Sequence, residues 1–413
     1  MNTIREKFLL ILRCALDGST PDQLDNTAPE EWNQIFRLAG DHHVLPLVYE
    51  VGLRIPTVRN GQIPAFLSAR KLIFRQVMVQ VRKTSEFLQL YRHLQQDGIT
   101  PLVTKGIICR NLYPQPDHRP SGDEDVLIPA EQFESCHESL LRFGMVTSTP
   151  EESLAATFEV SYSKPDSPLY IELHKQLFSP ESDAYGRWNR YFEDVFARAE
   201  EENIYGNPVR TMACTDHFFY LILHSFKHFL HGGFGIRQVC DIVLFANKYG
   251  CRIDWELVLN LCREIRAEKF AAALMKIGEK HLVFDPVQAC YPPSWQEIAT
   301  DEAPMLDDLI DGGVFGGSTL SRKHSSTITL DAVAASARGK KASLASTLFP
   351  PAKAMVMQYP WLGKHRWLLP LAWLLRIIRY GKETRSAADS SAAEALKIGK
   401  ERIALMKTYG IID

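Results

Sequence analysis

The sequence predicts an α+β protein in which a small mixed sheet is flanked by an N-terminal and a C-terminal helical region. Apolar residues recur at helical spacing through residues 1–95 and again from Cys214 to about Leu282. Between these regions, from Ile99 to about residue 205, short β-rich runs alternate with short helical runs. This alternation is typical of a mixed sheet with helices on one side.

Length and composition indicate a globular chain with several domains. It has 413 residues, of which 46% are hydrophobic and 23% are charged. We place the domain limits where the pattern changes. The expected regions are an N-terminal helical region at 1–95, a central core at 96–205, a helical region closing a cleft at 206–300, and an irregular segment with C-terminal helices at 301–413.

The N-terminal region contains three stretches with helical periodicity: IREKFLLILRCAL, EWNQIFRLAGDHHVLPLVYEVGL and FLSARKLIFRQVMVQVRKTSEFLQLYRHLQQ. Gly98 follows the last of them, and glycine is a common residue at the C-terminal end of a helix. We therefore expect the helical region to end there.

The central region supplies the strands. A β-rich run at 99–104 precedes a Lys-Gly turn, and a Pro-rich loop at 113–122 separates a short helix from the next strand. The predicted elements, in order, are a strand at 99–104, a helix at 107–112, a strand at 123–128, a helix at 131–143, and strands within FEVSYSK and LYIELHKQL.

Helical periodicity returns in CTDHFFYLILHSFKHFLHG and FGIRQVCDIVLFANKYG, and residues 285–345 are less regular. Near the end, WLLPLAWLLRII (367–378) is the most apolar stretch. A helix of this length is only ~18 Å long, too short to span a bilayer core of roughly 30 Å. We expect it to pack on the protein or on a second subunit, with an interfacial helix as the alternative.

Charge and cysteine content narrow the class of protein. The formal net charge is −2, so the chain gives no strong nucleic-acid signal. The eight cysteines form no C-x-x-C pair, and the apolar N-terminal stretch lacks a small-residue cleavage site. We therefore expect reduced cysteines and a cytoplasmic protein without a membrane span.

Three carboxylates carry the clearest chemical signal. Asp123 and Asp125 flank one residue of a predicted strand, so both side chains should lie on the same face about 7 Å apart. Glu172 lies in YIELH, where its apolar neighbours face the opposite way. If the two strands are adjacent, the three acids converge and could hold Mg²⁺. The alternative is a pair of solvated acids on an edge strand.

The stretch from Lys105 to Pro129 resembles the signature of the polymerase-beta-like nucleotidyltransferase superfamily. More closely, it is similar to a bacterial family of uncharacterised nucleotidyltransferases. The resembling motifs are Lys105-Gly106, the Tyr-Pro-x-Pro loop at 113–116, Arg119 and Gly122-Asp123-Glu124-Asp125. Similar text also occurs at LAGDHHVLPL (38–47), ELH (172–174) and around His224 to Asp241, so that the likeness spans about residues 35–380.

This resemblance implies a polymerase-beta-like nucleotidyltransferase sheet in the central core. It also implies transfer of a nucleoside monophosphate from an NTP to an unknown acceptor hydroxyl on a small molecule or a protein. Two Mg²⁺ ions, with Mn²⁺ as the alternative, would be held by Asp123, Asp125 and Glu172 as the catalytic and metal-binding residues. Glu172 would be the third ligand or the base.

The resemblance also implies substrate-binding residues. Gly106 would let the backbone approach the triphosphate, Lys105 would be a mobile cation beside the phosphates, and Arg119 would make a bidentate phosphate contact. The alternatives are a plain turn glycine, a solvated lysine, and an arginine paired with Asp117 or Asp123.

Histidines complete this set. His174 should face the acids, either orienting a carboxylate or contacting substrate, and its alternative is a hydrogen-bonded structural histidine. His224, Lys227 and His228 occupy one face of a helix and should form a substrate-facing polar strip. A zinc site or interdomain hydrogen bonding is the alternative. Arg237 and Asp241 are four residues apart, as in an intrahelical ion pair.

Two departures from the family pattern bear on turnover. Glu124 stands between the two acids, where the family usually has an apolar residue, and Gly106-Ile107 replaces a Gly-Gly or Gly-Ser turn. They favour the alternative function, a catalytically inactive protein that binds a nucleotide or a partner. P-loop, Rossmann and G-x-S-x-G motifs do not occur, so the sequence gives no support to those classes.

Overall fold

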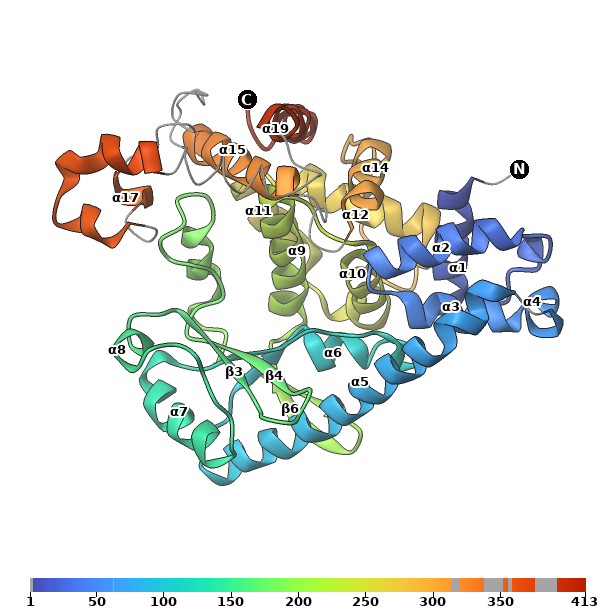
Figure 1. Cartoon of the computed structure of the whole chain (residues 1–413), viewed down its shortest axis with the longest axis horizontal. Helices are drawn as coiled ribbons and strands as arrows, with labels where there is room; N and C mark the ends of the chain where they lie inside the picture. The colour runs from blue at the N-terminus through green and yellow to red at the C-terminus, as the bar shows by residue number, and fades with distance from the viewer. Residues whose placement is uncertain (1–2, 62, 314–319, 338–351, 356–358, 376–391) are drawn as a thin grey trace.

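The structure, a computed structural model, describes residues 3–61, 63–313, 320–337, 352–355, 359–375 and 392–413. It confirms the predicted α+β class: a four-stranded mixed sheet lies between helices of the N-terminal and C-terminal regions (Figure 1). The late stretch 367–378 is described only as far as residue 375.

The N-terminal region is helical, as its periodicity predicts. Its helices are α1 (Ile4–Asp17), α2 (Pro29–Asp41), α3 (Leu45–Arg54), α4 (Pro56–Asn60) and α5 (Pro64–Gln96). The first begins with a capping box between Thr3 and Glu6 and ends at Gly18, which has φ 79°. The 33-residue α5 runs from the N-terminal helices to the sheet, so it contributes apolar residues to both cores.

The four-stranded sheet has the order β1-β2-β4-β3. Its strands are β1 (Leu102–Thr104), β2 (Glu124–Leu127), β3 (Glu159–Ser163) and β4 (Tyr170–His174). β2 pairs antiparallel with β1 and parallel with β4, and β3 pairs antiparallel with β4. All four lie where the sequence predicts strands, but β2 begins one residue later than expected, so Asp123 immediately precedes it.

The two faces of the sheet have different partners. One face buries Val126, Ile171 and Leu173 in a core shared with the C-terminal half of α5, with α6 (Gly106–Arg110) and with α7 (Phe133–Arg142). The other face looks toward the C-terminal helices (Figure 1). Because side chains alternate along a strand, the polar residues of β2 and β4 on this second face lie together.

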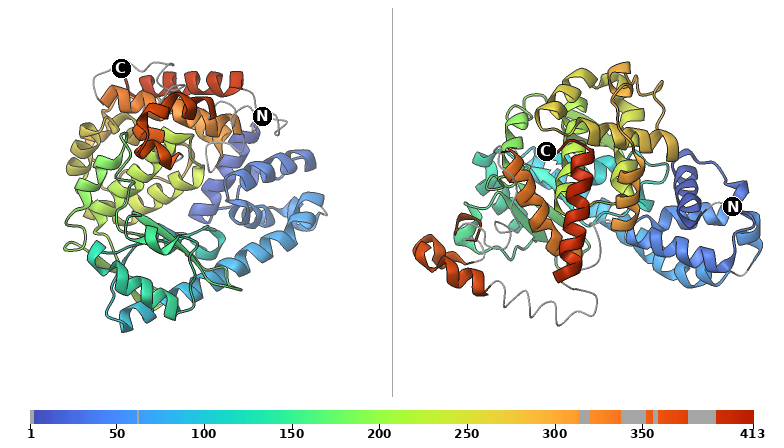
Figure 2. Two further views of the ribbon diagram at one scale, coloured as in Figure 1. Left: turned by 60° about the vertical axis from the view of Figure 1, so that its left-hand side comes forward. Right: turned by 90° about the horizontal axis from the view of Figure 1, so that it is seen from above.

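The C-terminal region packs mainly as helices. They are α9 (Cys214–His231), α10 (Ile236–Tyr249), α11 (Trp255–Glu264), α12 (Glu268–His281), α13 (Pro293–Gln296), α14 (Ala303–Gly312), α15 (Leu320–Ala337), α17 (Ala352–Met355) and α19 (Ala392–Thr408). The short α8 (Glu151–Leu154) lies in the central region, between α7 and β3. α9 and α10 pack against each other and cover the sheet's polar face, while α15 and α19 lie side by side above α9 (Figures 1 and 2).

A β-hairpin that the sequence pattern did not predict joins the core to α9. Its strands, β5 (Glu200–Ile204) and β6 (Asn207–Thr211), are connected by Tyr205 and Gly206, which both have positive φ. A two-residue turn with positive φ at both positions matches the twist of an antiparallel pair. Gly206-Asn207 was the sequence signal for this turn. The hairpin was missed because the acidic residues 200–202 in its first strand are poor β-formers.

The expectation of reduced cysteines is wrong at one pair. Cys251 and Cys290 form a disulfide, although they are 39 residues apart in sequence. No local motif links them, since their contact depends on how the segment after α12 folds back. The remaining cysteines are free and buried, as expected of thiols in apolar helices.

The apolar segment near the C-terminus is only partly packed. Ala372 is buried in a small cluster with Met355 and Leu362, whereas Trp367 is 76% exposed and Leu374 is 54% exposed. Docking of this exposed side on a second subunit therefore stays a prediction. Among the described residues, no helix has the length and apolar character needed to cross a membrane.

Candidate functional site

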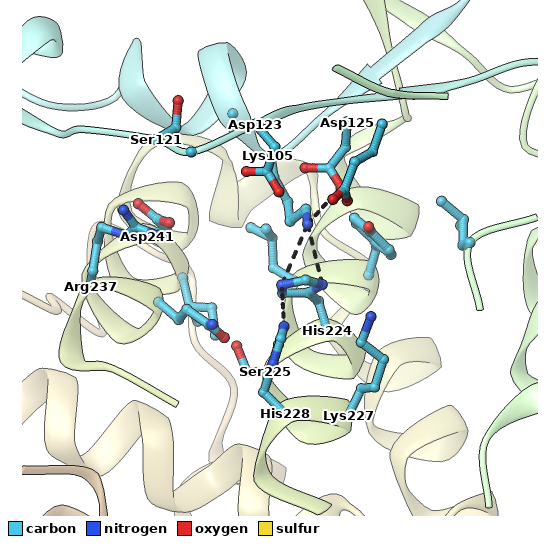
Figure 3. Close-up of a pocket in the computed structure, with 18 of the residues that line it drawn as sticks. Lys105, Ser121, Asp123, Asp125, His224, Ser225, Lys227, His228, Arg237 and Asp241 are labelled. Carbon is cyan, nitrogen blue, oxygen red and sulfur yellow. Dashed lines mark hydrogen bonds and ion pairs between the residues drawn. The ribbon is translucent and has the colours of Figure 1, made fainter. Parts of the chain in front are cut away.

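A pocket of about 400 Å³ lies between the sheet and helices α9 and α10 (Figure 3). Residues of the β1–α6 turn, of β2 and of β4 line one side, and residues of α9 and α10 line the other. Every residue that the sequence analysis assigned to the site lines this pocket: Asp123, Asp125, Glu172, Lys105, Gly106, Arg119, His174, His224, Lys227 and His228.

The acids meet because of the strand register. In the parallel pair β2–β4, Asp125 lies directly opposite Glu172. One ligand atom each from Asp125, Glu172 and His174 lies within 4.8 Å of the others. Asp123, two residues before Asp125, faces the same pocket. The expected strand adjacency is thus observed, and His174 joins the acids as its spacing from Glu172 predicts.

Asp125 is buried and charged. Its carboxylate is 2.8 Å from the ammonium of Lys105 and 3.2 Å from Nε2 of His174. Burial alone would raise the pKa of Asp125, but the Lys105 cation and the His174 hydrogen bond outweigh it and lower the pKa below its usual range. Asp125 is therefore ionised throughout the physiological range.

Glu172 has the opposite electrostatic environment. Its carboxylate is 3.9 Å from His174, and the described residues provide no lysine or arginine partner for it. Burial, followed by repulsion from Asp125 and Asp123, raises the pKa of Glu172 to about 7. A proton or a metal cation would relieve this repulsion.

The donor set is suited to a divalent cation. Asp125 and Glu172 offer carboxylate oxygens, with Asp123 beside them, and oxygen ligands are those that Mg²⁺ prefers. His174 touches Asp125 through Nε2 and lies 3.5 Å from Glu159 through Nδ1, so it is held between two acids and orients Asp125.

Lys105 forms an ion pair with Asp125 in the structure, and its expected contact with phosphate stays a prediction. It follows β1 directly, and Thr104 lies opposite Asp125 in the antiparallel pair β1–β2. Its backbone has φ 42°, an uncommon value for a residue with a side chain. This conformation leaves the ammonium beside Asp125 and 3.4 Å from both ring nitrogens of His224 (Figure 3).

The polar strip of α9 faces the acids, as the helical spacing predicts. His224 lies 3.1 Å from His228, and Lys227 extends from the same helix into the pocket (Figure 3). Burial and the Lys105 charge hold the pKa of His224 well below its usual range, so this imidazole is neutral and can accept a hydrogen bond. Among the described residues, no third ligand accompanies the two histidines, which leaves the zinc alternative unsupported.

Arg119 forms an ion pair with Asp241, an acid that the sequence analysis had paired with Arg237. It is buried and donates through two nitrogens to both carboxylate oxygens of Asp241, with Nε at 3.0 Å. Tyr113 donates to the same carboxylate at 2.8 Å. The alternative for Arg119, a pair with Asp117 or Asp123, is therefore wrong, as is the suggested intrahelical pair of Arg237 with Asp241. The expected phosphate contact of Arg119 stays a prediction.

Gly106 is required by close packing. A Cβ at this position would lie 2.1 Å from a carboxylate oxygen of Glu124. That oxygen accepts the backbone N–H of Ile107 at 2.7 Å, and the other oxygen pairs with Arg110 at 2.7 Å. Gly106 therefore lets Glu124 approach the start of α6, on the side of β2 that faces away from the acids.

Arg237 is a pocket residue that the sequence analysis did not assign to the site. Its guanidinium donates to the backbone carbonyl of Pro120, and its Nε is buried without a hydrogen-bond partner. Its four-residue spacing suggested an ion pair with Asp241. Asp241 instead binds Arg119, which lies 122 residues earlier in the chain, and no sequence signal reveals this contact. Arg237 could have been found only from the tertiary contact.

Comparison with known proteins gives two matches. A family model described as "Uncharacterised nucleotidyltransferase" matches residues 28–282, which is more than half of the chain and includes every residue of the pocket discussed above. The match ends at residue 282, so it does not cover the part of the likeness that the sequence analysis placed between residues 283 and 380. Among solved structures, the chain is similar to an antigenic nucleotidyltransferase-like protein from Paracoccidioides brasiliensis, at 13% identity and a TM-score of 0.30, over 50% of this chain and 95% of that one. No curated protein matches the chain.

Proposed function

Because the chain belongs to the family of uncharacterised nucleotidyltransferases, we propose that it moves a nucleoside monophosphate from an NTP to an acceptor hydroxyl and releases pyrophosphate. The observation that supports this proposal best is the position of Asp125 opposite Glu172 on neighbouring parallel strands, at the floor of a pocket. The acceptor would be a hydroxyl of a small molecule or of a protein side chain.

The cation site would consist of Asp125, Glu172 and Asp123, with His174 orienting Asp125. We propose two Mg²⁺ ions, or Mn²⁺ in their place. When bound, such ions neutralise phosphate oxygens and make a hydroxyl easier to deprotonate. The crowding of these acids, which raises the pKa of Glu172 to about 7, supports the fit of a cation here.

The chain's own groups would position and neutralise the substrates. Glu172, with its pKa near neutrality, is suited to accept the proton of the acceptor hydroxyl. Lys227 projects into the pocket from α9 and would face the phosphates, with the neutral imidazole of His228 beside it. Lys105 would give up its contact with Asp125 when a cation binds there, and would then be free to contact phosphate.

Pyrophosphate release from each NTP, measured with candidate hydroxyl acceptors and with Mg²⁺ or Mn²⁺, tests the proposal. Asp125→Asn should abolish release, and Glu172→Gln should reduce it by about 10²- to 10⁴-fold, the usual contribution of a general base. Glu131→Gln, an exposed acid outside the pocket, is the matched control and should retain full activity. Equal activity of Asp125→Asn and wild type would contradict the proposal.

The second candidate function is nucleotide or partner binding without turnover. The observation that favours it is the Lys105–Asp125 ion pair, because an internal cation already occupies one of the acids that would hold a metal. In this case NTP would bind in the pocket, and the protein would release no pyrophosphate with any acceptor. Lys105→Met should strengthen cation binding at Asp125 under either candidate function, because it removes the competing ammonium. If the protein only binds its ligand, this variant should still release no pyrophosphate.

A further inference from the structure

The wall of the pocket across from the acids carries two cations without anionic partners. Lys227 extends from α9 and Arg237 from the first turn of α10. Among the described residues, Lys227 forms no ion pair or hydrogen bond, and Arg237 bonds only the Pro120 carbonyl while its buried Nε has no partner. Both side chains line the pocket, so both are accessible to a ligand in it.

Among the described residues, the neighbouring acids form no ion pair with these two cations, although Asp123 acts on the pKa of Arg237, and Asp125, Glu159 and Glu172 act on that of Lys227, from a distance. Asp241, one turn after Arg237, is occupied by Arg119 and Tyr113. Asp125, on the opposite wall, is paired with Lys105. Burial, followed by repulsion from Arg119, lowers the pKa of Arg237 to about 10, so it still carries a full charge at neutral pH.

A partly buried cation without a partner is unfavourable, and an anion would remove this cost. The ligand therefore has to bring negative charge to two separate points. Figure 3 shows Lys227 and Arg237 on either side of the His224–His228 pair, and they come from different helices. One carboxylate or one phosphate suits such an arrangement poorly, whereas a chain of linked phosphates can reach both cations.

We propose that Lys227 and Arg237 form a subsite for a linked-phosphate group, which under the proposed function is the triphosphate tail of the NTP. Arg237 contacts one phosphate with the free Nε edge of its guanidinium, and Lys227 contacts another as a point charge. The acids on the opposite wall would then bind the metal cations and lie beside the reacting end of the nucleotide. This assignment rests on the proposed function only for the identity of the ligand.

Isothermal titration of the full chain with inorganic tripolyphosphate, in EDTA and at fixed ionic strength, tests the subsite directly. Wild type should bind, and Arg237→Met and Lys227→Met should each weaken binding by about ten- to a hundredfold, as expected for a hydrogen bond to a charged group. Lys248→Met is the matched control: it removes a cation from the same helix α10 at a side chain that is 43% exposed and lies outside the pocket lining. It should bind like wild type.

Two further comparisons make the result specific. Orthophosphate should bind much more weakly than tripolyphosphate, and equal affinities would overturn the assignment to linked phosphates. Thermal melting shows whether either methionine variant is poorly folded. In that case Arg237→Lys and Lys227→Arg replace them, and these variants should retain part of the affinity because they keep the charges. Wild type that does not bind tripolyphosphate at millimolar concentration, or methionine variants that bind as well as the Lys248 control, would refute the subsite.

Failure of the subsite and failure of the proposed function give different results. Asp125→Asn should stop pyrophosphate release yet leave tripolyphosphate binding intact, since Asp125 lies on the opposite wall. Tripolyphosphate binding that depends on Arg237 and Lys227, without pyrophosphate release from any NTP, supports the subsite and rejects transfer. Turnover that survives in Arg237→Met and Lys227→Met with unchanged KM for NTP supports transfer and rejects the subsite.

Discussion

Replacing Glu172 by glutamine should stabilise the cation-free protein at alkaline pH and should also remove its response to divalent cations. The substitution keeps the shape of the side chain and deletes its charge. In the cation-free pocket this charge is unfavourable, because the carboxylate is mostly buried near Asp125 and Asp123. Under the proposed function, the same charge would hold a bound cation. The two effects have opposite signs, which makes the test selective.

The magnitude follows from the pKa. The ordinary value for Glu172 is 4.5, and the folded protein raises it to about 7. The folded state therefore holds the proton more tightly than the unfolded state, and this contribution to stability is complete below pH 4.5 and lost as pH rises through 7. The loss amounts to at most about 3 kcal/mol. The glutamine variant lacks this dependence, so its stability relative to wild type should be higher at pH 8 than at pH 5.

Urea unfolding in EDTA at pH 5 and pH 8 measures this difference, with Glu131→Gln as the exposed control. Adding Mn²⁺ or Mg²⁺ at pH 8 should then raise the stability of wild type, since a ligand that binds only the folded state stabilises it by mass action. Glu172→Gln should respond weakly. A stability difference between variant and wild type that is the same at both pH values would refute the electrostatic reasoning. A full cation response in the variant would remove Glu172 from the cation site.

Three other predictions follow from the same structure. Lys227→Ala should weaken NTP binding without lowering the melting temperature, because it removes a partly buried cation that has no anionic partner; a large drop in melting temperature with unchanged NTP affinity would show that the α9 strip is structural. Asp241→Asn should destabilise the protein by about 3–5 kcal/mol in urea unfolding because it leaves Arg119 buried without a counter-charge, and a loss below 1 kcal/mol would contradict this. Purified protein should not float with anionic liposomes, and flotation that disappears on deletion of residues 365–380 would instead establish an interfacial helix.

The acids could be predicted from sequence because their geometry depends on a local rule. Alternation along a strand places Asp123 and Asp125 on one face, and the apolar neighbours of Glu172 fix which way it points. Only the adjacency of the two strands had to be assumed, and β2 and β4 do pair in the required register. The α+β class was predictable for the same reason, since helical and strand periods are local properties of the text.

The contacts of Arg119, Arg237 and Lys105 could not be predicted in this way, because they depend on how distant segments pack together. Arg119 belongs to a loop before β2 and Asp241 to α10, and their pairing is decided by how α10 packs over that loop. This pairing in turn leaves Arg237 without its neighbour in the helix. The position of Lys105 depends on its positive backbone φ of 42°, and no sequence pattern predicts such a conformation for a lysine.

Glu124, the departure that seemed to weigh against turnover, bears mainly on the fold. Alternation directs its side chain away from Asp125, and the structure places it, fully buried, against the start of α6. There Arg110 neutralises it at 2.7 Å, and Gly106 leaves room for it. Because a compensated charge on the far face of β2 adds little field to the pocket, Glu124 gives no reason to expect an inactive site. Under the proposed function, the contact that bears on activity is the Lys105–Asp125 pair, since a metal cation would compete with this ammonium for the same carboxylate.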